Sequence, residues 1–180
     1  MAEFSEVIRA RRSVRNYENR PIPDAVLDHI LDTAKWTPSW ANTQCWEVII
    51  IKEAVMKTQL QSAMGNTNPA WKSLAAAPVV LAICGKLNSA GFYKDKVTTK
   101  FGDWFMFDLG IFTQSLCLAA QDEGLGTVIT GLFDHDKAKE ILKVPEGFEL
   151  VSLIPIGYPA KIPSAPKRRE PVEFIHYETF

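Results

Sequence analysis

The most distinctive candidate for a binding site is a group of arginines near the start of the chain. Arg9, Arg11, Arg12 and Arg15 place four guanidinium groups within seven positions, with the hydroxyl of Ser13 among them. A guanidinium presents a planar fork of donors that matches the oxygens of a phosphate group, and several of them this close repel one another unless an anion lies between them. The cluster is therefore either an anion-binding site or a solvated basic surface, which is the more ordinary role of a charge run.

A second candidate binding segment runs from Pro38 to Trp46, with the sequence PSWANTQCW. Polar side chains such as Ser39 and Asn42, placed in a loop directly before a strand, can hydrogen-bond the edge of a heterocycle. Trp40 can offer an aromatic face to the same ligand, so it is a candidate for the wall of a substrate pocket. Serine and asparagine are also common in plain turns, and the segment alone leaves both interpretations open.

Two further segments carry weaker signals. Residues 124–131 (GLGTVITG) hold glycines without the GxGxxG spacing, and they follow a helix and precede a strand, which is the reverse of a dinucleotide-binding context. Gly131 can instead let a backbone N–H approach a ligand closely. The run Lys167-Arg168-Arg169, late in a proline-rich tail, is by itself best interpreted as a solvated surface.

Other kinds of site find no support in the sequence. His29, His135 and His176 are scattered, with no HExxH motif or ligand-spaced pair, so we expect no metal site. The chain also has no GxSxG motif and no P-loop. Its three cysteines lack CxxC spacing, which argues against a disulfide framework, and Cys84 and Cys117 lie in apolar runs that predict core positions.

The elements that must position these segments follow from hydrophobic periodicity. The pattern predicts helices over residues 3–12, 24–34, 55–63, 104–123 and 135–142. It predicts strands over residues 46–51, 79–84, 127–130 and 150–156. Residues 85–100 are polar and weakly patterned, which indicates a surface loop or lid. With no internal repeat or linker, we expect a single α+β domain over residues 1–180.

The helix predicted over residues 104–123 is apolar on nearly all sides. Leu109 and Leu116 repeat at helical spacing, and Phe105 makes a further side apolar. A helix of this kind lies at the centre of something larger, and in a chain of 180 residues that can include a second subunit. The tail from about Tyr158 is rich in proline yet too apolar for a free disordered tail, so we expect an extended arm that packs on another surface.

The charge and hydropathy of the chain limit the classes of partner and the cellular compartments that we expect. Net charge is −1 and the pI is about 6.3, so the whole chain has no electrostatic attraction to nucleic acid or to a membrane surface. No apolar stretch approaches the roughly 20 residues of a membrane span, and the N-terminal sequence lacks the apolar segment of a secretory signal. We expect a cytoplasmic protein without nucleic-acid or membrane partners.

The order of these segments is more specific than any one of them. Residues 11–15 (RRSVR), 38–46 (PSxxNxQxW), 124–127 (GLGT) and 156–159 (IGYP), followed by a basic arm, resemble the FMN-dependent nitroreductase family over nearly the whole chain. The two N-terminal motifs are the specific part. The resemblance implies a three-layer α+β sandwich around a mostly antiparallel sheet, in an intertwined homodimer with two equivalent FMN sites.

The resemblance also implies which residues hold the cofactor. Arg11, Arg12, Ser13 and Arg15 would bind the phosphate and ribityl chain of FMN. Pro38, Ser39 and Asn42 would reach the isoalloxazine from the opposite subunit, while Thr130 and Gly131 would lie by its reactive edge. Lys167 and Arg169 would help to hold the phosphate.

The implied activity is hydride transfer from NADH or NADPH through FMN to a small organic acceptor such as a nitroaromatic or a quinone, by a ping-pong scheme in one shared pocket. Cys45 stands where many members have proline, and Thr130 stands where several nitro-reducing members have an acidic residue, so the acceptor stays open. The alternatives are another two-electron flavin reaction, such as reductive dehalogenation or oxidation of the flavin by oxygen, and a non-catalytic FMN-binding protein.

Overall fold

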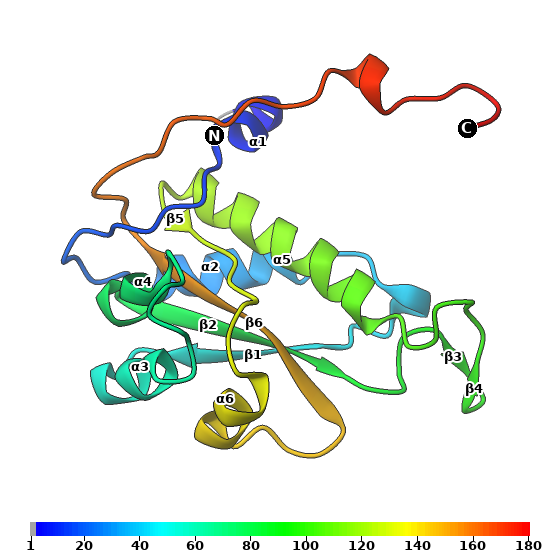
Figure 1. Ribbon diagram of the computed structural model, residues 1–180, viewed down its shortest axis with the longest axis horizontal. Coiled ribbons are helices and arrows are strands. Elements are labelled where there is room, and N and C mark those ends of the chain that lie inside the picture. Colours follow the sequence, from blue (N-terminus) through cyan, green and yellow to red (C-terminus); the bar gives the residue numbers. More distant parts are fainter. Residues whose placement is uncertain (1–2) are drawn as a thin grey trace.

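A four-stranded antiparallel sheet forms the middle layer of the protein, here a computed structural model in which residues 3–180 are described (Figure 1). The strands lie in the order β1 (Trp46–Ile51), β2 (Val79–Lys86), β6 (Phe148–Gly157) and β5 (Gly126–Thr127). β2 is buried from its first residue to Gly85, which explains why its sequence is a continuous apolar run instead of an alternating one.

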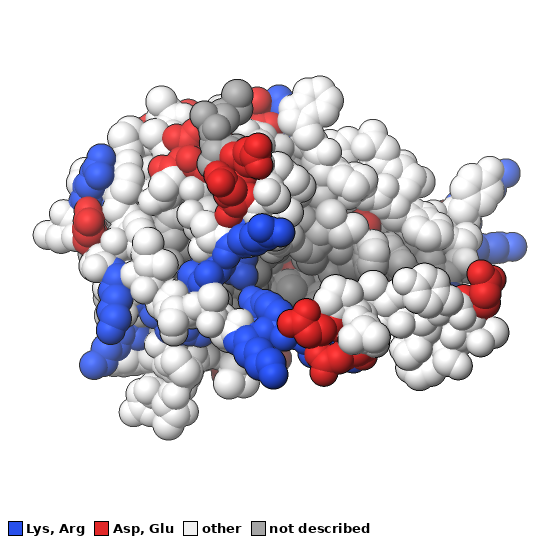
Figure 2. Space-filling view, turned by 90° about the horizontal axis from the view of Figure 1, so that it is seen from above, with Lys and Arg blue, Asp and Glu red and all other residues white. Residues whose placement is uncertain are grey.

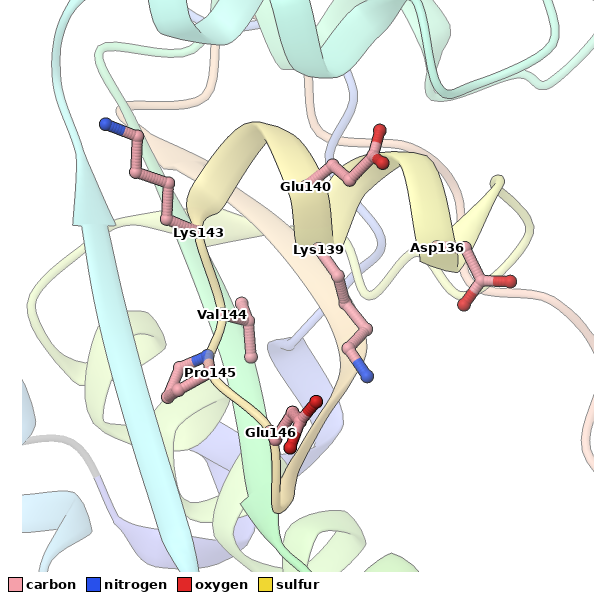
Figure 3. Close-up of a pocket in the computed structure, with 7 residues that line it drawn as sticks. All are labelled: Asp136, Lys139, Glu140, Lys143, Val144, Pro145 and Glu146. Atoms are coloured by element: carbon pink, nitrogen blue, oxygen red, sulfur yellow. The ribbon is translucent and has the colours of Figure 1, made fainter.

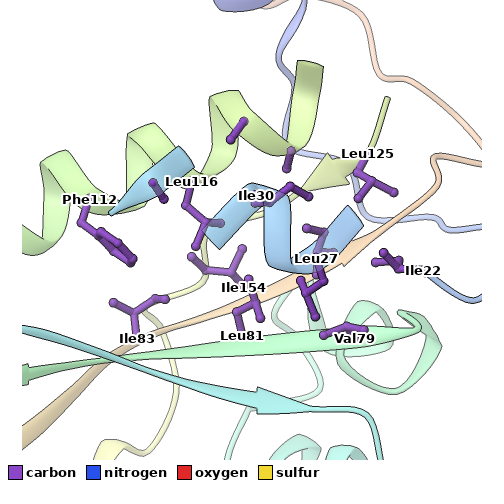
Figure 4. Close-up of a cluster of buried hydrophobic side chains, with 14 of the residues drawn as sticks. Ile22, Leu27, Ile30, Val79, Leu81, Ile83, Phe112, Leu116, Leu125 and Ile154 are labelled. Atoms are coloured by element: carbon purple, nitrogen blue, oxygen red, sulfur yellow. The ribbon is translucent and has the colours of Figure 1, made fainter. Parts of the chain in front are cut away.

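Helices cover both faces of this sheet. Alternate residues of β2 face opposite sides, so Leu81 and Ile83 pack with Ile30 and Leu116 in one core (Figure 4), while Val80 belongs to the core on the other face. The helices of the first face are α2 (Asp24–Ala34) and α5 (Phe105–Asp122), and those of the second face are α3 (Ala54–Gln61), α4 (Trp71–Ala76) and α6 (His135–Leu142). The predicted three-layer α+β sandwich is therefore confirmed.

The structure corrects several local predictions. Helix α4 was not predicted, because six residues are too few to show a helical period. The stretch expected as a loop over residues 85–100 begins with the end of β2 and contains a hairpin of β3 (Phe92–Tyr93) and β4 (Lys96–Val97). Its turn residues, Lys94 and Asp95, have φ angles of 48° and 60°, which is the primed turn that suits hairpins, although Lys-Asp is not a standard turn signal.

Two other boundaries differ from the expectation. The strand predicted over residues 127–130 is regular only at Gly126–Thr127, with a single further bridge between Thr130 and Leu153. Helix α1 covers Phe4–Ala10 and ends before the arginines of residues 11–15, which are left in an irregular segment. Cys84 and Cys117 are buried free thiols, as predicted.

Helix α5 is buried on one side only. Leu109, Phe112 and Leu116 pack into the core, whereas Met106 and Phe107 are more than half exposed, at 55% and 57%. Large apolar side chains exposed to solvent in this way favour a homodimer, which remains a prediction.

The tail leaves the body of the molecule after β6. Backbone contacts pin its start, since the N–H of Ala160 donates to the carbonyl of Asn16 (3.0 Å) and Tyr17 pairs with Pro159. Beyond this point the chain runs past α1 and away from the sheet, with one short helical turn, η2 (Pro171–Glu173) (Figure 1). Every residue from 164 to 180 is exposed. Within residues 3–180, no helix combines the length and the apolarity that crossing a membrane requires.

Candidate functional site

The arginine segment that follows α1 is held against the edge of the sheet. Ser13 forms a parallel bridge with Thr127 of β5, and the N–H of Val14 donates to the Thr127 carbonyl at 2.9 Å. The Val14 side chain is buried, which anchors the segment to the body of the protein. A cavity of about 310 Å³ opens beside it, and we call it the arginine cradle; it is lined by Arg11, Arg12, Ser13, Arg15, Pro163, Ser164, Pro166 and Arg168.

The charges of the cradle are not balanced by carboxylates. In the part of the chain that the structure describes, the ion pairs join lysine or histidine to acidic residues and include no arginine. A guanidinium nitrogen of Arg12 donates to the carbonyls of Arg9 (2.5 Å) and Arg11 (2.8 Å), and one of Arg15 donates to the carbonyl of Ser13 (3.2 Å). Lysine and arginine side chains gather on the face that carries α1 and the tail, with groups of acidic side chains beside them (Figure 2). Such a surface favours an anion with several oxygen atoms.

The tail contributes to the cradle through a residue that the sequence interpretation did not single out. Of the basic run at residues 167–169, Arg168 is the member that lines the cavity. Arg169 donates to the carbonyl of Glu173 and lies over the Phe174 ring, with 5.6 Å between the guanidinium carbon and the ring centroid. Successive side chains of an extended chain point to different sides, which explains how one of three adjacent cations faces the cavity.

The segment that contains Pro38, Ser39 and Asn42 lies elsewhere, against the first turn of α5. The N–H of Trp40, at the start of the short helical turn η1 (Trp40–Asn42), donates to a carboxylate oxygen of Asp108 at 3.0 Å. The Trp40 ring lies 5.9 Å from the ring of Trp104, between centroids. We call residues 39–45 the tryptophan loop.

The cradle and the tryptophan loop lie at opposite ends of α5 (Figure 1). The helix has 18 residues, which corresponds to a length of about 27 Å. Within one chain the two candidate groups therefore do not meet. A two-fold symmetric pair can bring the loop of each subunit to the cradle of the other, as the resemblance implies. This arrangement remains a prediction.

An extended segment leads from the cradle along β6 to a second cavity. Gly126, Thr127 and Thr130 pair in one register with Gly157, Ile156 and Leu153. From residue 127 to residue 131 an extended chain covers about 13 Å. There Gly131 lines a cavity of about 470 Å³, together with Phe105, Met106, Ile129, His135, Glu149, Leu150, Val151 and Ser152.

Thr130 and Gly131 differ in what they offer this second cavity. Thr130 is buried, and both its N–H (3.0 Å) and its hydroxyl (2.6 Å) donate to the Leu153 carbonyl. Gly131 is exposed and adds no side chain, so a ligand can approach its backbone. The contact of Thr130 with a flavin that the resemblance implies remains a prediction.

The residues that line the two cavities suit the chemistry of FMN. The arginine cradle supplies cations for a phosphate, and the second cavity supplies apolar walls for a planar ring, with the extended segment between them. A third cavity, of about 350 Å³ beside α6, has a different character (Figure 3). Its acidic and basic side chains alternate, with Lys139 and Glu146 extending toward one another. Lys139 also pairs with Glu149 at 2.7 Å, so the local charges compensate each other.

The position of the cradle depends on a glycine of β5. A Cβ atom at Gly126 would lie 2.6 Å from the Cβ of Val14, which is too close for any real contact. Gly126→Ala is expected to push the arginine segment outward, to lower the free energy of unfolding by about 1–3 kcal/mol and to weaken FMN binding. Thermal denaturation and flavin titration measure the two effects. Gly65→Ala is the control, because its nearest neighbour would be Thr67 Oγ1 at 3.8 Å; equal behaviour of the two variants would contradict the prediction.

Comparison with known proteins identifies the family. The nitroreductase family model matches residues 8–158. A putative NADH dehydrogenase/NAD(P)H nitroreductase of Methanothermobacter thermautotrophicus is 30% identical over 177 residues, covering 96% of this chain and 85% of the relative. Human iodotyrosine deiodinase 1 is 26% identical over 197 residues, covering 96% and 67%. The crystal structure of a nitroreductase family protein from Clostridium novyi NT superposes with a TM-score of 0.78 at 29% identity, covering 88% and 86%. The chain therefore belongs to the nitroreductase family of oxidoreductases.

Proposed function

We propose that this chain acts as a homodimer that takes a hydride from NADH or NADPH and delivers two electrons to a small organic acceptor. The observation that carries the proposal is the convergence of Arg11, Arg15 and Arg168 on one cavity that an extended segment joins to a second, apolar one. FMN, when bound, supplies the redox chemistry, because its ring can accept a hydride and release the electrons in a later step.

In the proposed reaction the residues of the chain bind and orient the cofactor and shield its ring from water. The arginines of the cradle orient a phosphate by charge-assisted hydrogen bonds. Phe105, Met106 and Ile129 form apolar walls at the second cavity and keep water from part of it. We propose that donor and acceptor occupy this one pocket in turn, which is a ping-pong scheme.

His135 and Glu149, the two titratable side chains of the second cavity, already have polar neighbours. The two ring nitrogens of His135 lie 2.8 Å from the Leu150 carbonyl oxygen and 3.0 Å from the Gly131 carbonyl oxygen. Glu149 accepts from Lys139 at 2.7 Å. We therefore assign no general acid or base to the chain, and solvent supplies the protons in the proposed reaction.

A second candidate function is reductive dehalogenation of an aromatic substrate. It is favoured by the likeness to human iodotyrosine deiodinase 1, which extends over 96% of this chain. The ring of Trp104 lies 5.9 Å from the ring of Trp40 and 5.9 Å from that of Phe101, between centroids, so the three offer aromatic faces near the start of α5. Aromatic acceptors of either kind, nitro or halogenated, would suit such a surface.

The decisive experiment uses the purified full-length protein under anaerobic conditions. We expect a yellow protein with non-covalent FMN near one per subunit, bleached by NADH or NADPH and reoxidised by an organic acceptor. A series of a nitroaromatic, a quinone and a halogenated phenol separates the two candidate functions. A colourless protein that FMN cannot reconstitute would refute the proposal, and a yellow protein that neither donor bleaches would identify a non-catalytic flavin carrier.

A further inference from the structure

The tryptophan loop is held in a conformation that its residues do not favour. Ala41, Asn42 and Gln44 have φ angles of 43°, 57° and 47°, in the left-handed region where side chains other than glycine are uncommon. Asparagine tolerates this region, whereas alanine and glutamine rarely adopt it. Such backbones persist only where surrounding contacts impose them, and they cluster at sites with a function.

Two of the contacts that hold this conformation, one at each end of the loop, meet at one buried carboxylate. Oδ2 of Asp108 accepts the N–H of Trp40 at 3.0 Å, at the start of the loop. The same oxygen lies 3.8 Å from Sγ of Cys45, at the end of the loop. Inside the loop the hydroxyl oxygen of Ser39 accepts the N–H of Gln44 at 2.9 Å. Asp108 is therefore the group that ties both ends of the loop to α5.

Asp108 is a buried acid that is held, within the described part of the chain, by hydrogen bonds and not by an ion pair. The residue is 1% exposed, and no ion pair found among residues 3–180 includes it. Its position in the first turn of α5 lets the helix dipole stabilise a negative charge. Burial raises the pKa of Asp108, and the donors on Trp40 and Cys45 oppose that rise. Burial, followed by the neighbouring Asp108, raises the pKa of Cys45 to about 12, so this thiol stays protonated and can donate.

We propose that Asp108 is a positioning residue whose buried carboxylate fixes both ends of the tryptophan loop and thereby sets where Ser39 and Asn42 meet the flavin ring. Cys45, which stands in place of the more usual proline, supplies the second donor. The inference rests on the proposed function, because it assumes that this loop contacts a flavin. It adds a residue that contacts neither the cofactor nor the substrate.

The test compares Asp108→Leu, which removes the acceptor, with Asp108→Asn, which keeps an acceptor oxygen for the Trp40 N–H. Affinities for FMN and riboflavin are measured by flavin fluorescence titration, and the ring environment by visible circular dichroism of the bound flavin. Asp108→Leu is expected to lose about tenfold in affinity for both ligands, and to change the flavin dichroism. Asp108→Asn is expected to keep the wild-type dichroism and to lose much less affinity.

A matched pair at Cys45 keeps the proposal testable should Asp108→Leu not fold. Cys45→Ser retains a donor toward Asp108, whereas Cys45→Ala removes it at nearly the same size. We expect wild-type flavin dichroism in the serine variant and an altered spectrum in the alanine variant. Identical spectra in the two variants, or unchanged binding and dichroism in Asp108→Leu, would overturn the inference. These outcomes differ from a failure of the proposed function, in which the wild-type protein itself would not bind FMN.

Discussion

Replacing Arg11 and Arg15 together with alanine is expected to weaken FMN binding by about a hundredfold or more. Each guanidinium can make charge-assisted hydrogen bonds to a phosphate that are worth roughly 1.5–3 kcal/mol, and the two losses combine without full additivity. Riboflavin lacks the phosphate, so its weaker binding should change little. The double variant should keep its fold, because both arginines line an open cavity.

Fluorescence titration of FMN and riboflavin into both proteins measures this selectivity. Rising salt should weaken FMN binding to the wild type more than to the double variant, because screening acts on the charges that the variant lacks. Lys86→Ala with Lys137→Ala removes the same charge from positions outside the cradle and serves as the control. Equal losses for FMN and riboflavin would indicate that the substitutions disturb the fold. No loss for either ligand would indicate that the arginines form only a solvated surface.

The tail offers a single-residue version of the same experiment. Arg168→Ala should weaken FMN binding and leave riboflavin binding nearly unchanged, since Arg168 lines the cradle. Lys167→Ala is its matched neighbour and should have a smaller effect. The resemblance instead assigns the phosphate contact to Lys167 and Arg169, so a larger loss at Lys167 would favour that assignment.

Truncation of the chain after Ile162 is expected to produce a monomer that no longer retains flavin. The truncation removes Pro163, Ser164, Pro166 and Arg168 from the cradle, and with them an arm whose residues 164–180 are all exposed in the isolated subunit. Stable dimers of this kind bury more than about 2,000 Å² in total, and an extended apolar arm can contribute much of that area. The contacts of Pro159 and Ala160 with Tyr17 and Asn16 remain, so the subunit itself should stay folded.

Sedimentation velocity at micromolar concentration, with absorbance read at a protein and a flavin wavelength, measures both effects. The full-length protein should sediment as a flavin-loaded dimer. Phe174→Ser with Tyr177→Ser keeps the cradle intact and removes two of the exposed apolar side chains of the arm, so it should weaken the dimer more than it weakens binding of the phosphate. A stable, flavin-loaded monomer of the full-length chain would contradict the expectation.

The sequence by itself determined the chemistry of the candidate site and the class of the fold. Guanidinium groups this close repel one another unless an anion or solvent screens them, so Arg11, Arg12 and Arg15 could be identified as candidate anion ligands from residue type and spacing. The apolar runs of β2 and β6 could likewise be predicted as buried strands. The free energy gained by burying apolar side chains depends on their composition, which the sequence gives directly.

The tertiary structure decided where these groups lie and which neighbours they have. The pairing of Ser13 with Thr127 and of Tyr17 with Pro159 places the arginines beside the tail, and the length of α5 separates the tryptophan loop from them. The burial of Asp108 and the position of Arg168 at the cradle were not visible in the sequence, since one acid in an apolar helix and one cation in a run of three carry no distinctive local pattern. Residue type fixes what a side chain can bind, whereas contacts between segments far apart in the chain fix what it can reach.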